Sequence, residues 1–442
     1  MEFEGDERIF QKPNGGYGWI ILLSISLTNF ILIGCMYSFG IILKILKEHF
    51  NVTQDVANLL QSFNTGFLFA SGALSSALAK EFGCRKVMML SSFIYASTFF
   101  ISAFLSSFYL ITIMLGIIGG IAYGCTYLTS IIILVDYFDK KLGLANGIMM
   151  ASSGFGAFAF APLTKFLTKN FVWNHVLLIN GSIILTIVLF SSFLTPVEYY
   201  KKKHTNNAQL MESLKLNENY AETIPKDKPN ILIRILKEIT NFSLLKENFA
   251  FLLIVSSGFF VFAAYYIPFI YIPIRAQELE IHDYAWVISI AGLANIPNRL
   301  ILGIFCDKKV MKPVNMNTIC LLIAAFCLFC YFYLKTFALQ ICFGVVFAIP
   351  MAGVHSLSTP YLVEIVGSNK FRNANGILNT MRGIGAVLGP FFAGMLSERF
   401  NSIFYSFIFA GSSFLIAVVF SFFAGISLSA QKKNTPKNLT RV

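Results

Sequence analysis

Twelve apolar segments of roughly 20 residues each constrain this chain more than any other feature of its sequence. A helix of that length spans the hydrocarbon core of a bilayer, where its apolar side chains face outward. With approximate bounds, the predicted spans are 17–43, 56–80, 86–107, 109–136, 142–168, 173–195, 247–273, 282–306, 314–335, 337–365, 372–396 and 402–427. Only 13% of the 442 residues are charged, which is too few for a soluble protein of this length. The sequence therefore predicts an all-α membrane protein.

A long polar segment divides these spans into six and six. Residues 196–246 contain no apolar run long enough to cross a bilayer. We therefore predict an N-terminal six-helix bundle over 1–195, a cytoplasmic linker over 196–246, and a C-terminal six-helix bundle with a short cytoplasmic tail over 247–442.

Lys and Arg residues are distributed unequally between the two sides that the spans define. The side of both termini and the linker holds 25 of the 34, the opposite side holds 7, and Arg299 and Arg382 lie within spans. Cytoplasmic loops carry the excess of basic residues, so we expect both termini to be cytoplasmic. Topology thus explains the formal net charge of +12, which does not indicate nucleic-acid binding.

The two halves of the chain repeat a motif at an offset of 229 residues. Ala-Asn-Gly-Ile at 145–148 in the fifth span recurs at 374–377 in the eleventh, and a glycine pair and a proline follow at matching depths in both. Parallel repeats of six helices are typical of major facilitator transporters. The sequence thus predicts the major facilitator fold, with twelve transmembrane helices in two pseudo-symmetric bundles.

Three motifs resemble the signatures of the monocarboxylate transporter family, solute carrier family 16 of the major facilitator superfamily. The first, Pro-Asn-Gly-Gly-Tyr-Gly-Trp at 13–19, resembles the family motif acidic-Gly-Gly-Trp-Gly-Trp. The second extends from Tyr137 to Gly154 at the start of the fifth span, and the third extends from Arg382 to Pro390 in the eleventh. The residues to which we assign motif or gating roles are Asn14, Gly15, Gly16, Trp19, Asp139, Lys140, Lys141, Asn146 and Gly147.

The resemblance implies a multi-pass plasma-membrane transporter that has no cofactor. Its expected substrate is a small organic anion or an amino acid, and a single-span accessory glycoprotein is a candidate partner. The sequence contains no Gly-Lys-Ser/Thr phosphate loop, catalytic triad or metal-ligand cluster. We therefore expect neither an enzyme nor an ATP-driven pump.

Two positions depart from the proton-coupled lactate carriers of this family. Those carriers place a lysine deep in the first span and an aspartate four residues before an arginine in the eighth, where this chain has Ile41 and Asn295. We therefore favour a secondary active or facilitative carrier of a monocarboxylate or amino acid over a proton-coupled lactate or pyruvate symporter. The alternative from another class is a non-transporting membrane receptor or sensor on the same fold.

Arg299, inside the eighth span, is the leading candidate for substrate binding. A charge at this depth is costly and indicates function by default, and a guanidinium binds a carboxylate through two hydrogen bonds. Asn295 lies one helical turn earlier on the same face, and Pro297 loosens the helix between them. The alternative is that Arg299 pairs with a neighbouring helix and only holds the fold together.

Further candidates lie in other spans. Arg382 either contacts substrate or is structural, through a salt bridge such as one to Glu364 or through hydrogen bonds to carbonyls. His355 is the one histidine well inside a span and is a candidate for ion coupling, because histidine titrates near physiological pH. The aromatic residues expected to form a wall of the site are Tyr37, Phe39, Tyr265 and Tyr266.

Two loops on the side of the termini are expected to act as latches between helices. Gly72 precedes the charged stretch that includes Arg85, and Gly303 precedes Asp307. Small residues allow helices to approach closely, and the charges that follow can interact with helix ends. The alternative is that these charges only anchor the loops on the cytoplasmic side. Asp136, at the end of the fourth span, is expected to pair with the nearby basic turn at 139–141.

Overall fold

The computed structural model describes residues 14–195, 243–280 and 285–434, and every regular element in these ranges is a helix. Most of the predicted linker and both chain ends lie outside the described residues. The helices of the first half are α1 (Tyr17–Phe50), α2 (Gln54–Ala70), α3 (Gly72–Phe82), α4 (Cys84–Ser102), α5 (Phe108–Ile111), a π-helix (Thr112–Ile118), α6 (Gly119–Tyr137), α7 (Leu142–Asn170) and α8 (Trp173–Ser192). The helices of the second half are α12 (Ser243–Glu247), α13 (Phe249–Tyr265), α14 (Ile267–Glu278), α15 (Ala285–Asp307), α16 (Pro313–Tyr331), α17 (Phe337–Ser356), α18 (Ser358–Arg399) and α19 (Phe404–Asn434).

Eight helical stretches among the described residues are long and apolar enough to cross a membrane. One of them, Phe337–Arg399, contains two predicted spans, because Gly367 adopts a φ of 76° and breaks α18. The predicted spans at 56–80, 86–107 and 282–306 are also helical, as α2 with α3, α4 and α15, but they are not among the eight. The structure thus confirms an all-α membrane protein, in which several of the predicted spans are broken into two helices.

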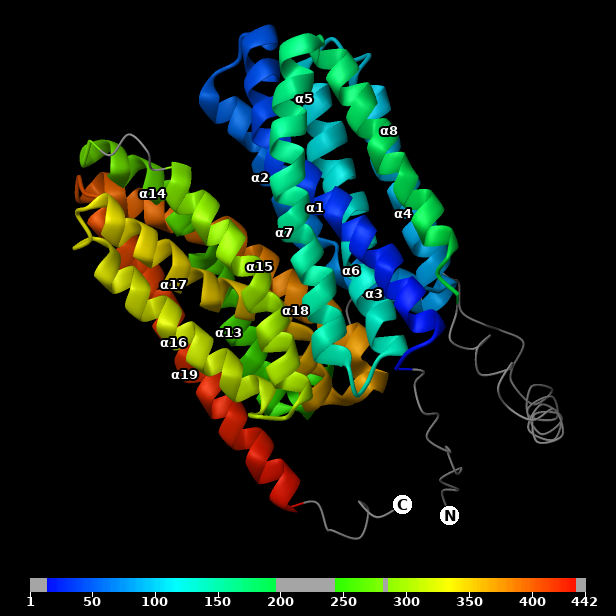
Figure 1. The fold of residues 1–442 in the computed structure, drawn as a ribbon, viewed down its shortest axis with the longest axis vertical. Helices are drawn as coiled ribbons and strands as arrows, with labels where there is room; N and C mark the ends of the chain where they lie inside the picture. Colours follow the sequence, from blue (N-terminus) through cyan, green and yellow to red (C-terminus); the bar gives the residue numbers. More distant parts are fainter. Residues whose placement is uncertain (1–13, 196–242, 281–284, 435–442) are drawn as a thin grey trace, which may run out of the picture.

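The helices form two bundles, one from α1–α8 and one from α13–α19 (Figure 1). The bundles approach each other where α1 begins and α19 ends, which we call the terminal end. They diverge toward the opposite end, near α5 and α14, which we call the distal end (Figure 1). Between the bundles, α7 packs along α15, and α18 packs along α2 and α3. The sequence repeat relates these two contacts.

Glycine allows the backbones to meet at both contacts. A Cβ atom on Gly143 of α7 would clash with the carbonyl oxygen of Gly303 in α15. At the second contact, a Cβ atom on Gly72 of α3 would lie 2.7 Å from the carbonyl oxygen of Gly376 in α18. Any larger residue at these positions forces the helices apart.

Candidate functional site

A small cavity lies between the two bundles, and its empty volume is about 530 Å³ only when the space that opens to its surroundings is included. Both halves of the chain contribute to its wall, and the lining includes apolar side chains such as Ile33, Met36 and Leu68. The aromatic and polar residues in the wall are Tyr37, Phe69, Tyr123, Tyr127, Ser153, Tyr265, Tyr266, Arg299 and His355. None of the described residues in the lining carries a carboxylate. The cavity therefore combines a mainly aromatic wall with one buried guanidinium.

Arg299 reaches across the boundary between the bundles. Its side chain is 9% exposed, and Nη1 donates to the carbonyl oxygen of Met150 and to Oγ of Ser153, both in α7. The Nε and Nη2 groups make no hydrogen bond with the described residues, and none of the ion pairs among those residues includes Arg299. One edge of the guanidinium is therefore unused at a cavity where a carboxylate would neutralise the buried charge.

Asn295 lies on the same helix but serves a different contact. Its Nδ2 donates to the carbonyl oxygen of Ala348 in α17 at 3.2 Å, and the residue is not part of the cavity wall. This placement differs from the expected one beside Arg299, because the long arginine side chain extends to α7 while the short amide stays within the C-terminal bundle.

His355 faces the cavity from the end of α17. Its Nε2 lies 3.2 Å from Oη of Tyr265 in a hydrogen bond whose donor depends on the histidine tautomer. The ring centroids of His355 and Tyr265 are 5.3 Å apart in an edge-on arrangement. The imidazole and the Tyr265 ring thus form one polar corner of the aromatic wall.

Arg382 lies behind the cavity wall. Its Nη2 donates to Oη of Tyr361 at 2.7 Å, and its Nη1 donates to Oδ1 of Asn379 at 3.4 Å. The guanidinium also stands 5.2 Å from the ring centroid of Phe262, which contacts His355 in turn. The expected ion pair with Glu364 is not among the ion pairs of the described residues, and the carbonyl that Arg382 bonds is the side-chain amide of Asn379. Arg382 is not among the described residues that line the cavity, where direct substrate contact was expected, and Phe262 contacts both Arg382 and His355.

The aromatic residues of α1 are divided between the cavity and the core. Tyr37 is 59% exposed and lines the cavity, whereas Phe39 is 7% exposed and packs edge-on against Phe99 at 6.5 Å. Phe39 is therefore a core residue and not part of the site. The reason is helical geometry, because side chains two residues apart point to nearly opposite faces.

The first two signature motifs contact each other at the terminal end. Oδ1 of Asn14 accepts the backbone N–H groups of Asp139 and Lys140, both at 2.8 Å. The ring of Trp19 packs edge-on against Phe138 at 5.6 Å, and Nζ of Lys141 lies 5.7 Å from the Trp19 ring centroid. These side chains join the start of α1 to the turn before α7.

The glycines of the first motif shape the start of α1. Gly16 is the N-cap residue and adopts a φ of 56°, a left-handed conformation that suits glycine. The carbonyl oxygen of Gly15 accepts the N–H of Gly18 at 3.1 Å and begins the first turn. The two glycines therefore set the direction in which the helix leaves Asn14.

Asp307 joins the bundles at the terminal end. Its Oδ1 and Oδ2 accept the backbone N–H groups of Gly143 and Leu144, each at 2.7 Å, at the start of α7. A carboxylate at a helix N-terminus accepts otherwise unpaired N–H groups and interacts favourably with the helix dipole. Burial raises the pKa of the Asp307 carboxyl, and the two hydrogen bonds oppose that effect.

Asn146 and Gly147 of the repeated motif lie at the same contact. Nδ2 of Asn146 donates to the carbonyl oxygen of Ser356 at 2.7 Å, and its Oδ1 accepts from Oγ1 of Thr359 at 3.3 Å. A Cβ atom on Gly147 would lie 2.8 Å from the carbonyl oxygen of Arg299. The motif thus places a polar contact and a close backbone approach directly beside the cavity.

Arg85 does not take part in this contact. It is exposed and makes no hydrogen bond or ion pair with the described residues. The charges of the two expected latch loops therefore do not pair with each other, because Asp307 is occupied by backbone groups of α7.

An ion pair between the bundles was not expected from the sequence. Oδ2 of Asp136, at the end of α6, lies 2.8 Å from Nη2 of Arg372 in α18, 236 residues away. The expected pairing of Asp136 with the turn at 139–141 is replaced by this contact. A second ion pair at this end, Lys370 with Glu247 at 3.0 Å, stays within the C-terminal bundle.

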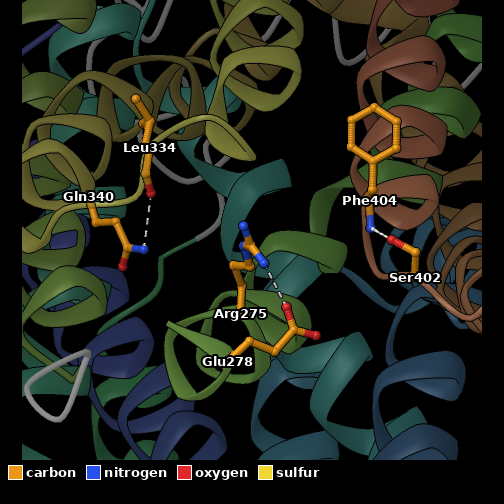
Figure 2. Close-up of polar contacts among 6 residues, drawn as sticks. All are labelled: Arg275, Glu278, Leu334, Gln340, Ser402 and Phe404. Carbon is orange, nitrogen blue, oxygen red and sulfur yellow. Dashed lines mark hydrogen bonds and ion pairs between the residues drawn. The ribbon is translucent and has the colours of Figure 1, made fainter. Parts of the chain in front are cut away.

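Figure 2 shows polar contacts at the distal end that stay within the C-terminal bundle. Nη1 of Arg275 lies 2.8 Å from Oε2 of Glu278 within α14, and its guanidinium stands 4.2 Å from the Phe332 ring centroid. Nε2 of Gln340 donates to the carbonyl oxygen of Leu334 at 3.4 Å, which ties the loop between α16 and α17. In contrast, the bonds of Asp307, Asn146 and Arg372 cross between bundles at the terminal end.

Comparison with known proteins agrees with this architecture. The family model described as Major Facilitator Superfamily matches residues 25–390. Monocarboxylate transporter 3 of Gallus gallus is 26% identical over 445 residues, covering 96% of this chain and 81% of the relative. Monocarboxylate transporter 14 of Homo sapiens is 23% identical, covering 92% of this chain and 91% of the relative. These matches confirm the resemblance that the three motifs indicate.

Solved structures with the same fold are more distant in sequence. The proton:xylose symporter XylE, bound to 6-bromo-6-deoxy-D-glucose, has a TM-score of 0.71 at 15% identity and covers 92% of this chain and 96% of its own. The human organic anion transporter MFSD10 has a TM-score of 0.70 at 14% identity and covers 92% and 100%. At these identities the likeness concerns the fold alone.

Proposed function

Because the chain belongs to the major facilitator superfamily, whose members move solutes across membranes, we propose that it carries a small carboxylate-bearing solute, a monocarboxylate or an amino acid. Transport occurs by alternating access, in which the two bundles rock around a site near the middle of the membrane. The terminal end is closed in the present conformation, by Asp307 among others, and the cavity lies between the bundles.

The unused edge of Arg299 carries this proposal. A carboxylate that leaves water must regain strong hydrogen bonds, and Nε and Nη2 of Arg299 are donors that no described residue uses. Nε is buried, so a solute carboxylate reaches it only when the guanidinium or its neighbours shift. Among the described residues, the cavity wall offers no competing carboxylate. A solute carboxylate is therefore the group that best satisfies this buried charge.

The rest of the wall suits a compact organic body. Tyr37, Tyr123 and Tyr127 come from the first bundle, and Tyr265 and Tyr266 come from the second. Tyrosine rings bury apolar surface, and their hydroxyls bind polar substituents. This arrangement supports a monocarboxylate or an amino acid over a highly charged solute.

Proton coupling is not part of the leading proposal. Ile41 and Asn295 replace the lysine and aspartate of proton-coupled relatives, and His355 is the one titratable imidazole in the cavity wall. We therefore propose a facilitative or weakly coupled carrier, and a proton-coupled lactate or pyruvate symporter is the second candidate. An inward proton gradient that strongly accelerates uptake would favour the second candidate.

The proposed location is the plasma membrane, with both termini in the cytoplasm. The excess of Lys and Arg on the side of the termini supports this orientation, in which the terminal end faces the cytoplasm. We also propose the bundle bounds 1–195 and 247–442 with a linker at 196–246, and a single-span accessory glycoprotein as a candidate partner for surface delivery.

Uptake into liposomes that contain the purified protein tests the proposal. The substrate panel pairs carboxylates with their neutral amides: lactate with lactamide, and aromatic amino acids with amino acid amides. We expect saturable uptake of at least one carboxylate and weak or no uptake of its amide. A membrane receptor without transport activity would bind a carboxylate but show no uptake above empty liposomes, and equal uptake of acid and amide would contradict the role of Arg299.

A further inference from the structure

A groove separate from the central cavity lies between α16 and α19, on the outer side of the C-terminal bundle (Figure 1). Its empty volume is about 1050 Å³, including the space that opens to its surroundings. Ile319, Phe422 and Ile426 line it and are 45%, 56% and 50% exposed. Three large apolar side chains are exposed on a surface that faces lipid, so this part of the groove suits a hydrocarbon chain.

The terminal end of the same groove is polar. Nζ of Lys312 donates to Oγ of Ser429 at 2.8 Å, which bridges the start of α16 and the end of α19. The side chain of Asn315 lines the groove, is exposed, and makes no hydrogen bond with the described residues. Gly425 provides the space for this amide, since a Cβ atom there would lie 2.7 Å from Oδ1 of Asn315.

The charge around this polar end is positive. Lys308 and Lys309 are exposed in the loop before α16, and the sequences of α16 and α19 contain no acidic residue. Among the described residues, none of the ion pairs includes Lys312. The groove thus has an apolar length within the bilayer and a basic, hydrogen-bonding mouth at one membrane surface, which is the pattern of a lipid headgroup site.

We propose that the α16–α19 groove binds one anionic phospholipid from the leaflet at the terminal end. The phosphate accepts hydrogen bonds from Lys312 and Asn315, beside Ser429, whose hydroxyl donates to the carbonyl oxygen of Gly425. One acyl chain lies along Ile319, Phe422 and Ile426. A zwitterionic phospholipid fills the same apolar length but gains less from the lysines, because its headgroup has no net charge. The site is independent of the transported solute, since it lies outside the central cavity.

Native mass spectrometry of the full-length protein in detergent tests this site. The probes are phosphatidylserine and phosphatidylcholine with identical acyl chains, titrated separately. We expect one phosphatidylserine to bind with higher affinity than phosphatidylcholine. Lys312→Gln and Asn315→Asp should each weaken phosphatidylserine binding about fivefold, the effect of roughly one basic residue at a membrane surface. Lys312→Arg should retain binding.

Lys335→Gln is the matched control, because Lys335 is exposed just beyond the opposite end of α16. This change should leave both lipids unaffected. Equal affinity of the wild-type protein for the two lipids would overturn the proposal, as would an equal loss of binding in Lys335→Gln or unchanged binding in both Lys312→Gln and Asn315→Asp.

Discussion

The α7–α15 contact and the α18–α3 contact are related by the sequence repeat, yet different groups hold them. Both rely on a glycine backbone approach, at Gly143 with Gly303 and at Gly72 with Gly376. Along α7 and α15, however, Asp307 also binds backbone N–H groups, and Arg299 bonds across to α7 beside the cavity.

The difference shows how a symmetric scaffold acquires an asymmetric function. The repeat supplies equal backbone geometry in both halves, while side chains at single positions decide which contact responds to a ligand. Arg299 is the proposed carboxylate ligand and also a bond between the bundles, so a substrate that engages the guanidinium changes the contact itself. On the proposed role of Arg299, the α7–α15 contact is the one expected to couple binding to bundle movement.

The largest expected effect comes from Arg299. Arg299→Gln should reduce uptake per surface molecule by about 100-fold or more, since it removes charge-assisted hydrogen bonds to a desolvated carboxylate. Arg299→Lys keeps the charge but loses the planar fork, so uptake should fall about tenfold. Uptake and surface abundance are measured together, with Arg85→Gln as the exposed control. Normal uptake per surface molecule in Arg299→Gln would show that the residue only holds the fold.

Enlarging the contact glycines should affect both halves equally. Gly143→Val and Gly72→Val each place side-chain atoms against a facing backbone, and overpacking of this kind costs about 1–3 kcal/mol. The conformation in which the terminal end is closed should therefore become about 5- to 100-fold less populated. This population is measured as the distance between two spin labels, one at Lys86 and one at Lys308, which are both exposed. The exposed Cys342 is replaced by serine so that it is not labelled. An effect in only one half would break the proposed equivalence of the two backbone contacts.

Asp307→Asn should affect only the α7–α15 contact. The amide has one acceptor oxygen for two N–H groups and no charge for the helix dipole, which weakens the contact by about 1 kcal/mol, or roughly fivefold. The same spin-label distances measure the shift. Asp139→Asn, just before the same helix, is the control and should leave the distances unchanged. An equal shift in both variants would indicate a general charge effect at this surface.

Two ion pairs involve residues of α18, and we expect both to have smaller effects than the changes above. Asp136 with Arg372 joins the bundles, and both side chains are about one-third exposed, so their coupling should change the closed population only two- to threefold. A double-mutant cycle with Asp136→Asn and Arg372→Gln isolates this coupling. If the coupling energy between Asp136 and Arg372 is near zero, the ion pair does not stabilise the closed conformation, and backbone contact alone holds α18 against α3.

The smallest effect is expected at Glu247, whose partner Lys370 lies in the same bundle. The hydrogen bond from Lys370 lowers the pKa of the Glu247 carboxyl. The stabilising contribution is therefore present above the usual carboxyl pKa and is lost as pH falls through the lowered value. Glu247→Gln should lower Tm slightly at pH 7, and this difference should shrink as the pH falls through the lowered pKa, without changing the spin-label distances. A changed distance would place this pair in the contact between bundles.

The sequence predicted the fold and Arg299, the main polar residue of the cavity, because both can be recognised from short stretches of sequence. Apolar length identifies spans, and a charged residue within a span is costly enough to indicate function, which led to Arg299. Tyr37 and His355, predicted on the same basis, also line the cavity. Tyr123 and Tyr127 were missed because α6 is buried along most of its length, so no periodic pattern separates cavity-facing from core-facing tyrosines.

Contacts between distant segments were not predictable from one sequence. The partners of Asp307 are backbone N–H groups, which every residue carries and no sequence pattern marks. Asp136 and Arg372 are 236 residues apart, and nearby lysines offered an equally reasonable partner. The placement of Phe39 was predictable in principle, because Tyr37 and Phe39 lie on opposite faces of one helix.

The hydrogen bonds of Asn14 have a consequence for the order in which the protein is made. Its acceptor oxygen binds N–H groups at positions 139 and 140, which leave the ribosome about 125 residues later. At a synthesis rate of about 5–20 residues per second, residues 139 and 140 are synthesised roughly 6–25 s after Asn14. During that interval the first helix is inserted but not yet fixed at its start. The segment before α1 therefore becomes anchored only after the first four spans and the turn that follows them exist.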